Sequence, residues 1–416
     1  MARTLVWAAA AMTALAGMAF GGPTTPEQIE ASNTALKEKI AALRSEKNLT
    51  RETAKTAADA ALEGIDIGGL TMDQIDELDG LSYGSHSEEA TARLKELSSS
   101  KDADGARAAV KTLVFMSEET SADEQAAALK AAATHPGLRE AFKQGKGYEL
   151  FIQAAYANKD ALTQVAGELA GVGDMLDESM SVDAIMQAQY LFSGLMGAGD
   201  ASAKAAQGLR VKLVTLAEAA GKTADGKVAE RLARTTEFLN GAFAKGTLVG
   251  NVSPELTIEW SSDPAIKSLA DLKGKVVVLD FWATWCGPCI RSFPNVRDLV
   301  SHYEGYPVAV VGVTSIQGKH YPKGGTPVDC TGDPAKEHSL MPELMKDHEM
   351  TWPVVFTKQN VFNPDYGING IPHVAILDPN GVVRFRGMHP ASDAADKHTK
   401  IDGLLKEFNL PAPPAH

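Results

Sequence analysis

The sequence predicts two structural parts: an all-α domain over residues 22–249, followed by an α/β domain over residues 250–416 with a mixed central sheet flanked by helices. The first part is rich in Ala, Leu, Glu, Lys and Gln, which are strong helix formers. In the second part, short β-branched apolar runs alternate with helical segments. A chain of 416 residues, 44% hydrophobic and 22% charged, is long enough for two or three globular domains.

The N-terminal segment has the features of a secretory signal peptide. Arg3 supplies a positive charge, residues 5–20 form an apolar run rich in Ala and Met, and small residues follow at the expected cleavage site. A membrane anchor is the alternative interpretation, but the run is shorter than the roughly 20 apolar residues of a spanning helix. We expect residues 1–21 to be a cleaved signal peptide, and the mature protein to be soluble and periplasmic or otherwise extracytoplasmic.

Residues 22–249 contain helix signals but no catalytic constellation. Thr25 and Pro26 are typical of a helix start, and Gly- and Pro-containing breakers separate segments of about 10–20 residues. No motif repeats at a fixed period. His86 and His135 have no second ligand at metal-binding spacing, and we interpret them as surface residues. The role of this domain is unknown; it is interpreted as a spacer or as a docking site for a partner.

The α/β part begins with a strand, a helix and a second strand. Residues 276–282 and 307–314 are nearly continuous apolar runs, which are typical of strands buried on both faces. Residues 290–303 between them have helical character. Because the connections are short, this order predicts a right-handed crossover and a parallel pair of strands.

The end of the chain predicts an antiparallel hairpin. Two β runs, at residues 373–378 and 382–386, are joined by a turn that contains Asn380 and Gly381. Asn-Gly between two β runs is a strong hairpin signal. A last helix is expected at about residues 396–408. Parallel strands followed by an antiparallel hairpin give a mixed sheet.

Two of the three cysteines carry the chemistry that this sequence predicts. Cys286 and Cys289 are separated by two residues, directly after a buried strand and at the start of a helix. Zinc sites use the same spacing, but zinc needs a second pair of ligands. Cys330 is the only other thiol, and His320 and His338 are not at suitable spacing. We therefore expect no metal and no other cofactor.

The position of the pair favours redox chemistry for a physical reason. Unpaired backbone N–H groups at a helix N-terminus stabilise an anion, so the thiol of Cys286 is expected to form a thiolate readily. Cys286 would attack a client disulfide, and Cys289 would then displace the client's thiol. Pro288 fits the first helical turn, where its missing N–H does no harm.

A family resemblance covers residues 250–416. Residues 280–289, with the letters DFWATWCGPC, resemble the active-site segment of thioredoxins almost letter for letter. Together with residues 256–260 and 272–275, they resemble the TlpA/ResA-like branch of exported thioredoxin-fold thiol–disulfide oxidoreductases. The resemblance implies a thioredoxin fold and disulfide exchange with proteins.

The resemblance also implies roles for single residues. Cys286 matches the nucleophile, Cys289 the resolving thiol, and Asp280 a buried acid that assists proton transfer; a solvated carboxylate is the alternative for Asp280. Pro372 matches a cis-proline that faces the active site, with an ordinary turn proline as the alternative. The residues expected to shape the client-binding surface are Trp285, Gly287, Pro288, Ile371 and Pro372.

Three features depart from the family pattern or extend it. Many relatives carry Glu in the helix after the two cysteines, whereas residues 290–294 here read IRSFP, which weakens any transfer of a role in cytochrome maturation. His373 either influences the thiolate or faces solvent. Residues 315–339 form a long loop that contains Cys330, interpreted as a lid or third redox partner, or simply as a loop with an unpaired thiol.

The function expected from the sequence is that of an exported protein-disulfide reductase. Its expected partners are disulfide-bearing protein clients and an upstream membrane electron donor. A thiol peroxidase, or a helical scaffold with a regulatory redox site, are the alternatives. A net charge of −13 without a basic stripe argues against nucleic acid as a partner. The sequence does not fix the direction of electron flow.

Overall fold

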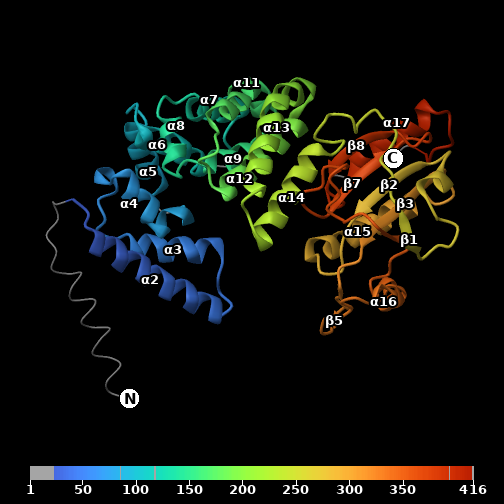
Figure 1. Ribbon diagram of the computed structural model, residues 1–416. Coiled ribbons are helices and arrows are strands. Elements are labelled where there is room, and N and C mark those ends of the chain that lie inside the picture. Colours follow the sequence, from blue (N-terminus) through green and yellow to red (C-terminus); the bar gives the residue numbers. More distant parts are fainter. Residues whose placement is uncertain (1–22, 85, 117–118, 393, 415–416) are drawn as a thin grey trace, which may run out of the picture. The chain divides into compact units, whose positions relative to one another are not determined.

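A computed structural model describes residues 23–84, 86–116, 119–392 and 394–414 (Figure 1). The expected signal peptide lies outside the described residues. Within them, no helix is long and apolar enough to cross a membrane. By its internal contacts the chain divides into two compact units, Met1–Leu191 and Phe192–His416. This division comes earlier than the boundary at residues 249 and 250 expected from composition, and the domain boundary stays a prediction.

The described part of the first unit is helical, as its composition predicts. Short 3-10 helices, at Ile67–Gly69, Asp79–Tyr83 and Val172–Met175, complete it. The α-helices are α2 (Pro26–Ser45), α3 (Arg51–Ala61), α4 (Met72–Glu77), α5 (Ser87–Leu97), α6 (Ala103–Val114), α7 (Ala122–Ala133), α8 (Leu138–Lys143), α9 (Glu149–Ala155), α10 (Lys159–Gln164), α11 (Ala166–Gly171) and α12 (Val182–Ala198), which extends into the second unit.

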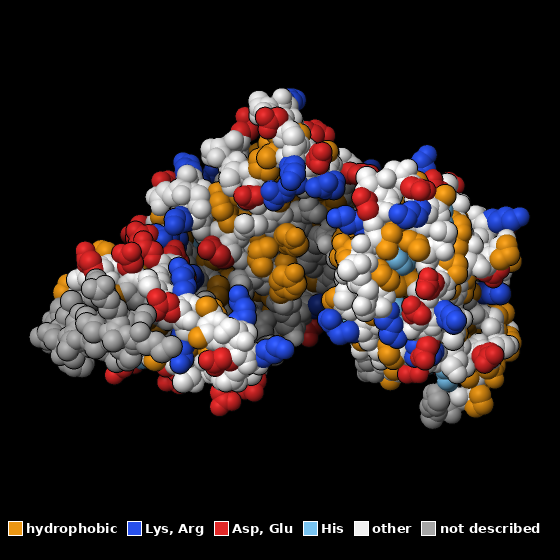
Figure 2. All heavy atoms as spheres, turned by 90° about the horizontal axis from the view of Figure 1, so that it is seen from below, with side chains coloured by type: hydrophobic (Ala, Val, Ile, Leu, Met, Phe, Trp, Pro, Cys, Tyr) orange, Lys and Arg blue, Asp and Glu red, His pale blue; other side chains and the backbone are white. Residues whose placement is uncertain are grey.

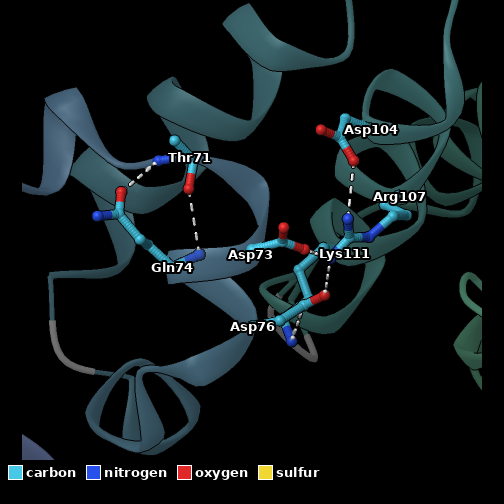
Figure 3. Close-up of polar contacts among 7 residues, drawn as sticks. All are labelled: Thr71, Asp73, Gln74, Asp76, Asp104, Arg107 and Lys111. Atoms are coloured by element: carbon cyan, nitrogen blue, oxygen red, sulfur yellow. Dashed lines mark hydrogen bonds and ion pairs between the residues drawn. The ribbon is translucent and has the colours of Figure 1, made fainter. Parts of the chain in front are cut away.

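Polar side chains fix the starts of several of these helices. The Thr25 hydroxyl accepts a hydrogen bond from the Gln28 N–H, and the Gln28 side chain accepts one from the Thr25 N–H, so α2 begins where the sequence predicts. Thr71 and Gln74 form the same capping box at α4 (Figure 3). His135 is not the surface residue we expected: it is buried, and its Nδ1 accepts the Gly137 N–H.

The second unit contains a six-stranded sheet in the order β1-β6-β3-β2-β7-β8 (Figure 1). Helices precede, interrupt and follow its strands. The elements are α13 (Asp200–Gly221), α14 (Gly226–Asn240), β1 (Ile258–Ser261), a 3-10 helix (Leu269–Leu272), β2 (Val276–Phe281), α15 (Gly287–His302), β3 (Val308–Ser315), β4 (Lys319–His320), β5 (Val328–Asp329), α16 (Pro334–Asp347), β6 (Val354–Thr357), β7 (His373–Leu377), β8 (Val383–Met388) and α17 (Ala394–Glu407).

Strand pairing agrees with the sequence prediction. β2 runs parallel to β3, and β3 runs parallel to β6. β7 and β8 form the predicted antiparallel hairpin, in which Gly381 adopts a φ of +81° that favours glycine. β7 also pairs antiparallel with β2, and β1 with β6. The sheet is therefore mixed, and this part of the chain has the thioredoxin fold.

Both faces of β2 are buried, as its continuous apolar run predicts. Successive side chains of a strand point to opposite faces. Val276 and Val278 belong to one core cluster with Phe293 of α15 and Leu404 of α17. Phe281 points to the opposite face, where its ring lies 5.2 Å from that of Tyr366. The end of β2 is thus held by packing on both sides.

The segment between α14 and the sheet packs within the second unit. The Phe243 N–H donates to the Asp365 carbonyl, and the Arg386 guanidinium lies 4.0 Å from the centre of the Phe243 ring. The Gly250 N–H donates to the Val383 carbonyl of β8. These contacts join residues 241–250 to the thioredoxin fold.

Residues 315–339 are more ordered than the long loop that the sequence suggested. β4 and β5 form a small antiparallel sheet. α16 then begins at Pro334, after an N-cap at Asp333 whose carboxylate accepts the Lys336 N–H. A helix cap and a pair of short strands are weak signals in sequence, because each depends on only a few residues.

On the face shown in Figure 2, acidic and basic side chains are interspersed rather than gathered into one basic patch. This distribution is consistent with the net charge of −13. It offers no continuous positive surface for a phosphate backbone on that face.

Candidate active site

The two cysteines of the CxxC motif form a disulfide at the N-terminus of α15. Cys286 is the N-cap residue and Cys289 lies in the first turn, with the two Cα atoms 5.2 Å apart. The Cys286 Sγ accepts a hydrogen bond from the Cys289 N–H at 3.2 Å. The helix N-terminus thus directs a backbone N–H at this sulfur, which favours the thiolate once the bond is reduced.

Asp280 lies inside the fold, and among the described residues it forms no ion pair. The residue is 2% exposed, and its Oδ1 has no hydrogen-bond partner within the described part of the chain. It shares the β2 face of Val278, which packs in the same core cluster as Cys289. Burial raises the pKa of Asp280 to about 7. A carboxyl group of this kind can exchange a proton near neutral pH.

The surroundings of Asp280 include two further unpaired polar atoms. Gly312 of β3 is its partner in the parallel register. A Cβ at Gly312 would lie 2.9 Å from the Trp282 Nε1 and 3.1 Å from the Trp352 Nε1. Neither indole N–H has a partner among the residues that the structure describes. Glycine at this position leaves the space that the two rings occupy.

The segment before β7 lies against the reactive sulfur. The peptide bond between Ile371 and Pro372 is cis, the geometry that the resemblance implies. The Cys286 Sγ lies 3.7 Å from the Ile371 carbonyl oxygen. Residues 85 positions apart in the sequence therefore meet at the site.

The remaining expected surface residues are accessible. Trp285 and Pro288 are exposed, whereas Gly287, Ile371 and Pro372 are partly buried. The Trp285 indole N–H donates to the Gln317 Oε1 at 2.9 Å, and its ring stacks on Phe362. We did not predict Gln317 or Phe362, because no local motif links either residue to the cysteines.

The side chain of His373 does not face solvent, which was one of the two interpretations that the sequence left open. Its side chain is buried, with its ring edge-on to Phe281, and its Nε2 accepts the Gly387 N–H. Burial, with a contribution from Arg386, lowers the pKa of His373 to about 3. It is therefore neutral at physiological pH and does not face solvent.

Cys330 is a buried free thiol at the end of the small sheet. Its Sγ lies 3.7 Å from the Val328 carbonyl oxygen. Burial raises the pKa of the Cys330 thiol, which disfavours the reactive thiolate. Among the described residues, no three His, Cys, Asp or Glu side chains are grouped so that they could hold a metal ion.

Comparison with known proteins agrees with this geometry. Residues 248–405 match the model of the Redoxin family. This Redoxin domain is similar to the thiol-disulfide oxidoreductase ResA of Oceanobacillus iheyensis, with 28% identity over 32% of this chain and 62% of the relative. It is also similar to the thioredoxin-like protein YneN of Bacillus subtilis, with 29% identity over 33% of this chain and 71% of the relative.

A solved structure of a thiol:disulfide interchange protein from Bacteroides sp. aligns with 37% of this chain and 91% of its own, at 20% identity and a TM-score of 0.29. The matches to the two sequence relatives cover about a third of this chain, and 62% of the length of ResA. Residues 248–405 thus match the Redoxin family model and are similar in sequence to part of a thiol-disulfide oxidoreductase. These relatives provide no information on the preceding helical residues.

Proposed function

We propose that this chain is an exported thiol–disulfide oxidoreductase that reduces disulfides in protein clients through Cys286 and Cys289. One observation carries the proposal: the two cysteines form a disulfide at the N-terminus of α15, with the Cys286 Sγ beside the Ile371 carbonyl. Cys286 thereby combines a helix N-terminus with a position beside the segment that precedes β7, and the residue is 3% exposed. The exposed Trp285 and Pro288 flank it.

The proposed reaction transfers two electrons to the client. The Cys286 thiolate attacks one client sulfur, which releases the other as a thiolate that takes a proton from water. The Cys289 thiol gives its proton to Asp280 and attacks the Cys286 Sγ, which releases the second client sulfur as a thiolate. This thiolate also takes a proton from water, and Asp280 then loses its proton to solvent. The client is then reduced, and the protein holds the disulfide seen here. The raised pKa of Asp280, caused by its burial, supports its role as proton acceptor.

Repeated turnover requires a dithiol donor that reduces the Cys286–Cys289 disulfide. We propose a membrane protein for this step, in keeping with the export signal expected in residues 1–21. N-terminal sequencing of the mature protein tests export directly. A new terminus near residue 22 is expected, and an intact Met1 on the mature protein would contradict cleavage.

For the helical domain we propose a role in docking a partner. An open pocket in the first unit supports this role, since it is lined by charged residues of both signs, among them Lys101, Asp104, Arg107 and Lys146. Charged linings suit a polar partner surface. Deletion is a poor test here because residues 241–250 pack within the second unit.

The first experiment is a thiol redox titration of the Cys286–Cys289 pair in a Cys330→Ser background, followed by tryptophan fluorescence. A potential near the roughly −270 mV of thioredoxin is expected for a reductase. A value near −120 mV would instead make the protein a disulfide donor. Absence of a reversible two-electron couple would overturn the oxidoreductase proposal.

Two variants separate the alternatives. A thiol peroxidase needs one activated cysteine, so peroxide consumption that survives Cys289→Ser would favour that activity. A scaffold would keep its partner after substitution of both Cys286 and Cys289. Under the proposed function, the double variant loses reduction of insulin disulfides entirely.

A further inference from the structure

Two stacked aromatic side chains lie exposed beside the reactive disulfide. Trp285 and Phe362 are each 41% exposed, with ring centres 6.2 Å apart and ring planes at 25°. Trp285 is the direct neighbour of Cys286 in the chain. Phe362 follows β6 and approaches the site from a distant part of the sequence. An exposed aromatic pair in this position is a candidate contact surface for another molecule.

Hydrogen bonds from Gln317 hold this pair in place. The Gln317 Oε1 accepts the Trp285 indole N–H at 2.9 Å. Its Nε2 donates to the carbonyl and hydroxyl oxygens of Ser315 at 2.8 and 3.0 Å. The Ser315 hydroxyl in turn accepts the N–H of Val361, the residue before Phe362, at 3.0 Å. One amide side chain therefore connects the two segments that carry the aromatic residues, directly at Trp285 and through Ser315 at Val361.

A buried carboxylate fixes the backbone of Gln317. Glu337 of α16 is 1% exposed, and its two oxygens accept the N–H groups of Gln317 and Gly318, each at 2.9 Å. Charge-assisted hydrogen bonds of this kind are stronger than neutral ones. The turn after β3 is thus anchored to α16, and the segment that the sequence described only as a long loop supports the active site.

We propose that Gln317, anchored by Glu337, is a positioning residue that holds Trp285 and Phe362 as a contact surface for apolar side chains next to a client disulfide. The inference rests on the proposed function and names its substrate class, a disulfide within a polypeptide. Since the pair adjoins Cys286, a client sulfur that reaches Cys286 brings its neighbouring residues over these rings. A small disulfide without a polypeptide chain brings none.

The test compares two disulfides in single turnover. The pre-reduced protein, in a Cys330→Ser background, is mixed with insulin or with hydroxyethyl disulfide, and the second-order rate constants are measured. Gln317→Leu is expected to lower the rate constant for insulin about tenfold, as for the loss of an anchored aromatic contact. The rate constant for hydroxyethyl disulfide is expected to change less than about twofold, and the reduction potential is expected to stay the same, because the cysteines are untouched.

A double-mutant cycle tests whether Gln317 acts through Trp285. Trp285→Phe keeps an aromatic ring but removes the indole N–H, so Gln317→Leu should have much less effect in that background. Gln164→Leu is the matched control: Gln164 is exposed in α10 and its side chain bonds to Asp123. This control should leave both rate constants unchanged.

Several results would overturn the inference. An equal fall for both disulfides would assign Gln317 to the chemistry of the cysteines, and no fall for insulin would remove its role. Full additivity with Trp285→Phe would break the link to the indole. If the Cys330→Ser parent reduces neither disulfide and shows no two-electron couple, the proposed function fails and this inference fails with it.

Discussion

Arg107 of the first unit and Asp280 of the second are both buried, but their side chains have different surroundings. In the first unit, Arg107 is 6% exposed and its guanidinium donates to Asp73, Asp76 and Asp104, each at 2.7 Å (Figure 3). In the second unit, Asp280 is 2% exposed, and its Oδ1 has no partner in the described part of the chain. One buried charge is compensated and the other is not.

The difference separates a structural charge from a chemical one. Burial alone would lower the pKa of Arg107, but the hydrogen bonds that its guanidinium donates to Asp76 and Asp73 raise the pKa above its usual value, so the residue stays charged. Burial raises the pKa of Asp280 to about 7, so this residue changes its charge near neutral pH. A group that keeps its charge can stabilise the fold, whereas a group that titrates can move protons.

The largest expected effect is on the pH dependence of stability at Asp280. The folded protein holds this proton more tightly than the unfolded chain, whose Asp pKa is about 4. The stabilising contribution of protonated Asp280 to the free energy of unfolding is therefore fully present below about pH 4, and it is lost as the pH rises through about 7. The loss amounts to roughly 4 kcal/mol.

Asp280→Asn should remove this dependence. Denaturant unfolding of the oxidised wild type and variant between pH 4 and 8 measures the difference, because contributions of other groups cancel. A constant difference across this range would contradict the raised pKa of Asp280.

A smaller loss of stability is expected when the compensated charge is removed. Arg107→Met keeps part of the side-chain volume but leaves Asp73, Asp76 and Asp104 without their shared partner. We expect a decrease of about 3 kcal/mol in the free energy of unfolding at pH 7, measured by denaturant titration. Lys111→Met, which removes only the ion pair with Asp76, is the control and should cost less than about 1 kcal/mol.

The same two sites should differ in activity. Asp280→Asn removes the proposed proton acceptor for Cys289, so we expect insulin reduction at pH 7 to slow about a hundredfold, equivalent to about 2.7 kcal/mol. Arg107→Met should change the rate less than about twofold. A large loss of activity in Arg107→Met, with a fold that circular dichroism shows to be intact, would contradict the interpretation of Arg107 as a purely structural charge.

The smallest expected effect on stability concerns the N-cap of α4, the helix whose aspartates pair with Arg107. Thr71→Ala removes the hydroxyl that caps α4, the helix that carries Asp73 and Asp76 (Figure 3). A loss of about 1 kcal/mol is expected in thermal or denaturant unfolding, with no change in activity. Thr71→Ser retains the hydroxyl and should behave like the wild type.

The sequence predicted the features that depend on neighbouring residues. The parallel strands β2 and β3, the hairpin of β7 and β8, the start of α2 and the CxxC motif each rest on a local pattern. β1, β6 and the small sheet of β4 and β5 were not predicted, because short strands carry little periodicity. We expected His135 at the surface and left two interpretations open for His373. Both residues are buried, and burial depends on what packs around a residue rather than on its neighbours in the sequence.

By itself, the sequence determined the class of the fold and predicted Cys286 and Cys289 as the candidate redox pair, because hydrophobic periodicity and the spacing of two cysteines are visible within a few residues. Tertiary structure alone decided which side chains complete the site. Gln317, Glu337 and Phe362 come together with Trp285 only because the turn after β3, the first turn of α16 and the segment after β6 meet in the fold. The burial of Asp280 likewise depends on packing against both faces of β2. A local sequence pattern cannot show whether a buried carboxylate has a hydrogen-bond partner.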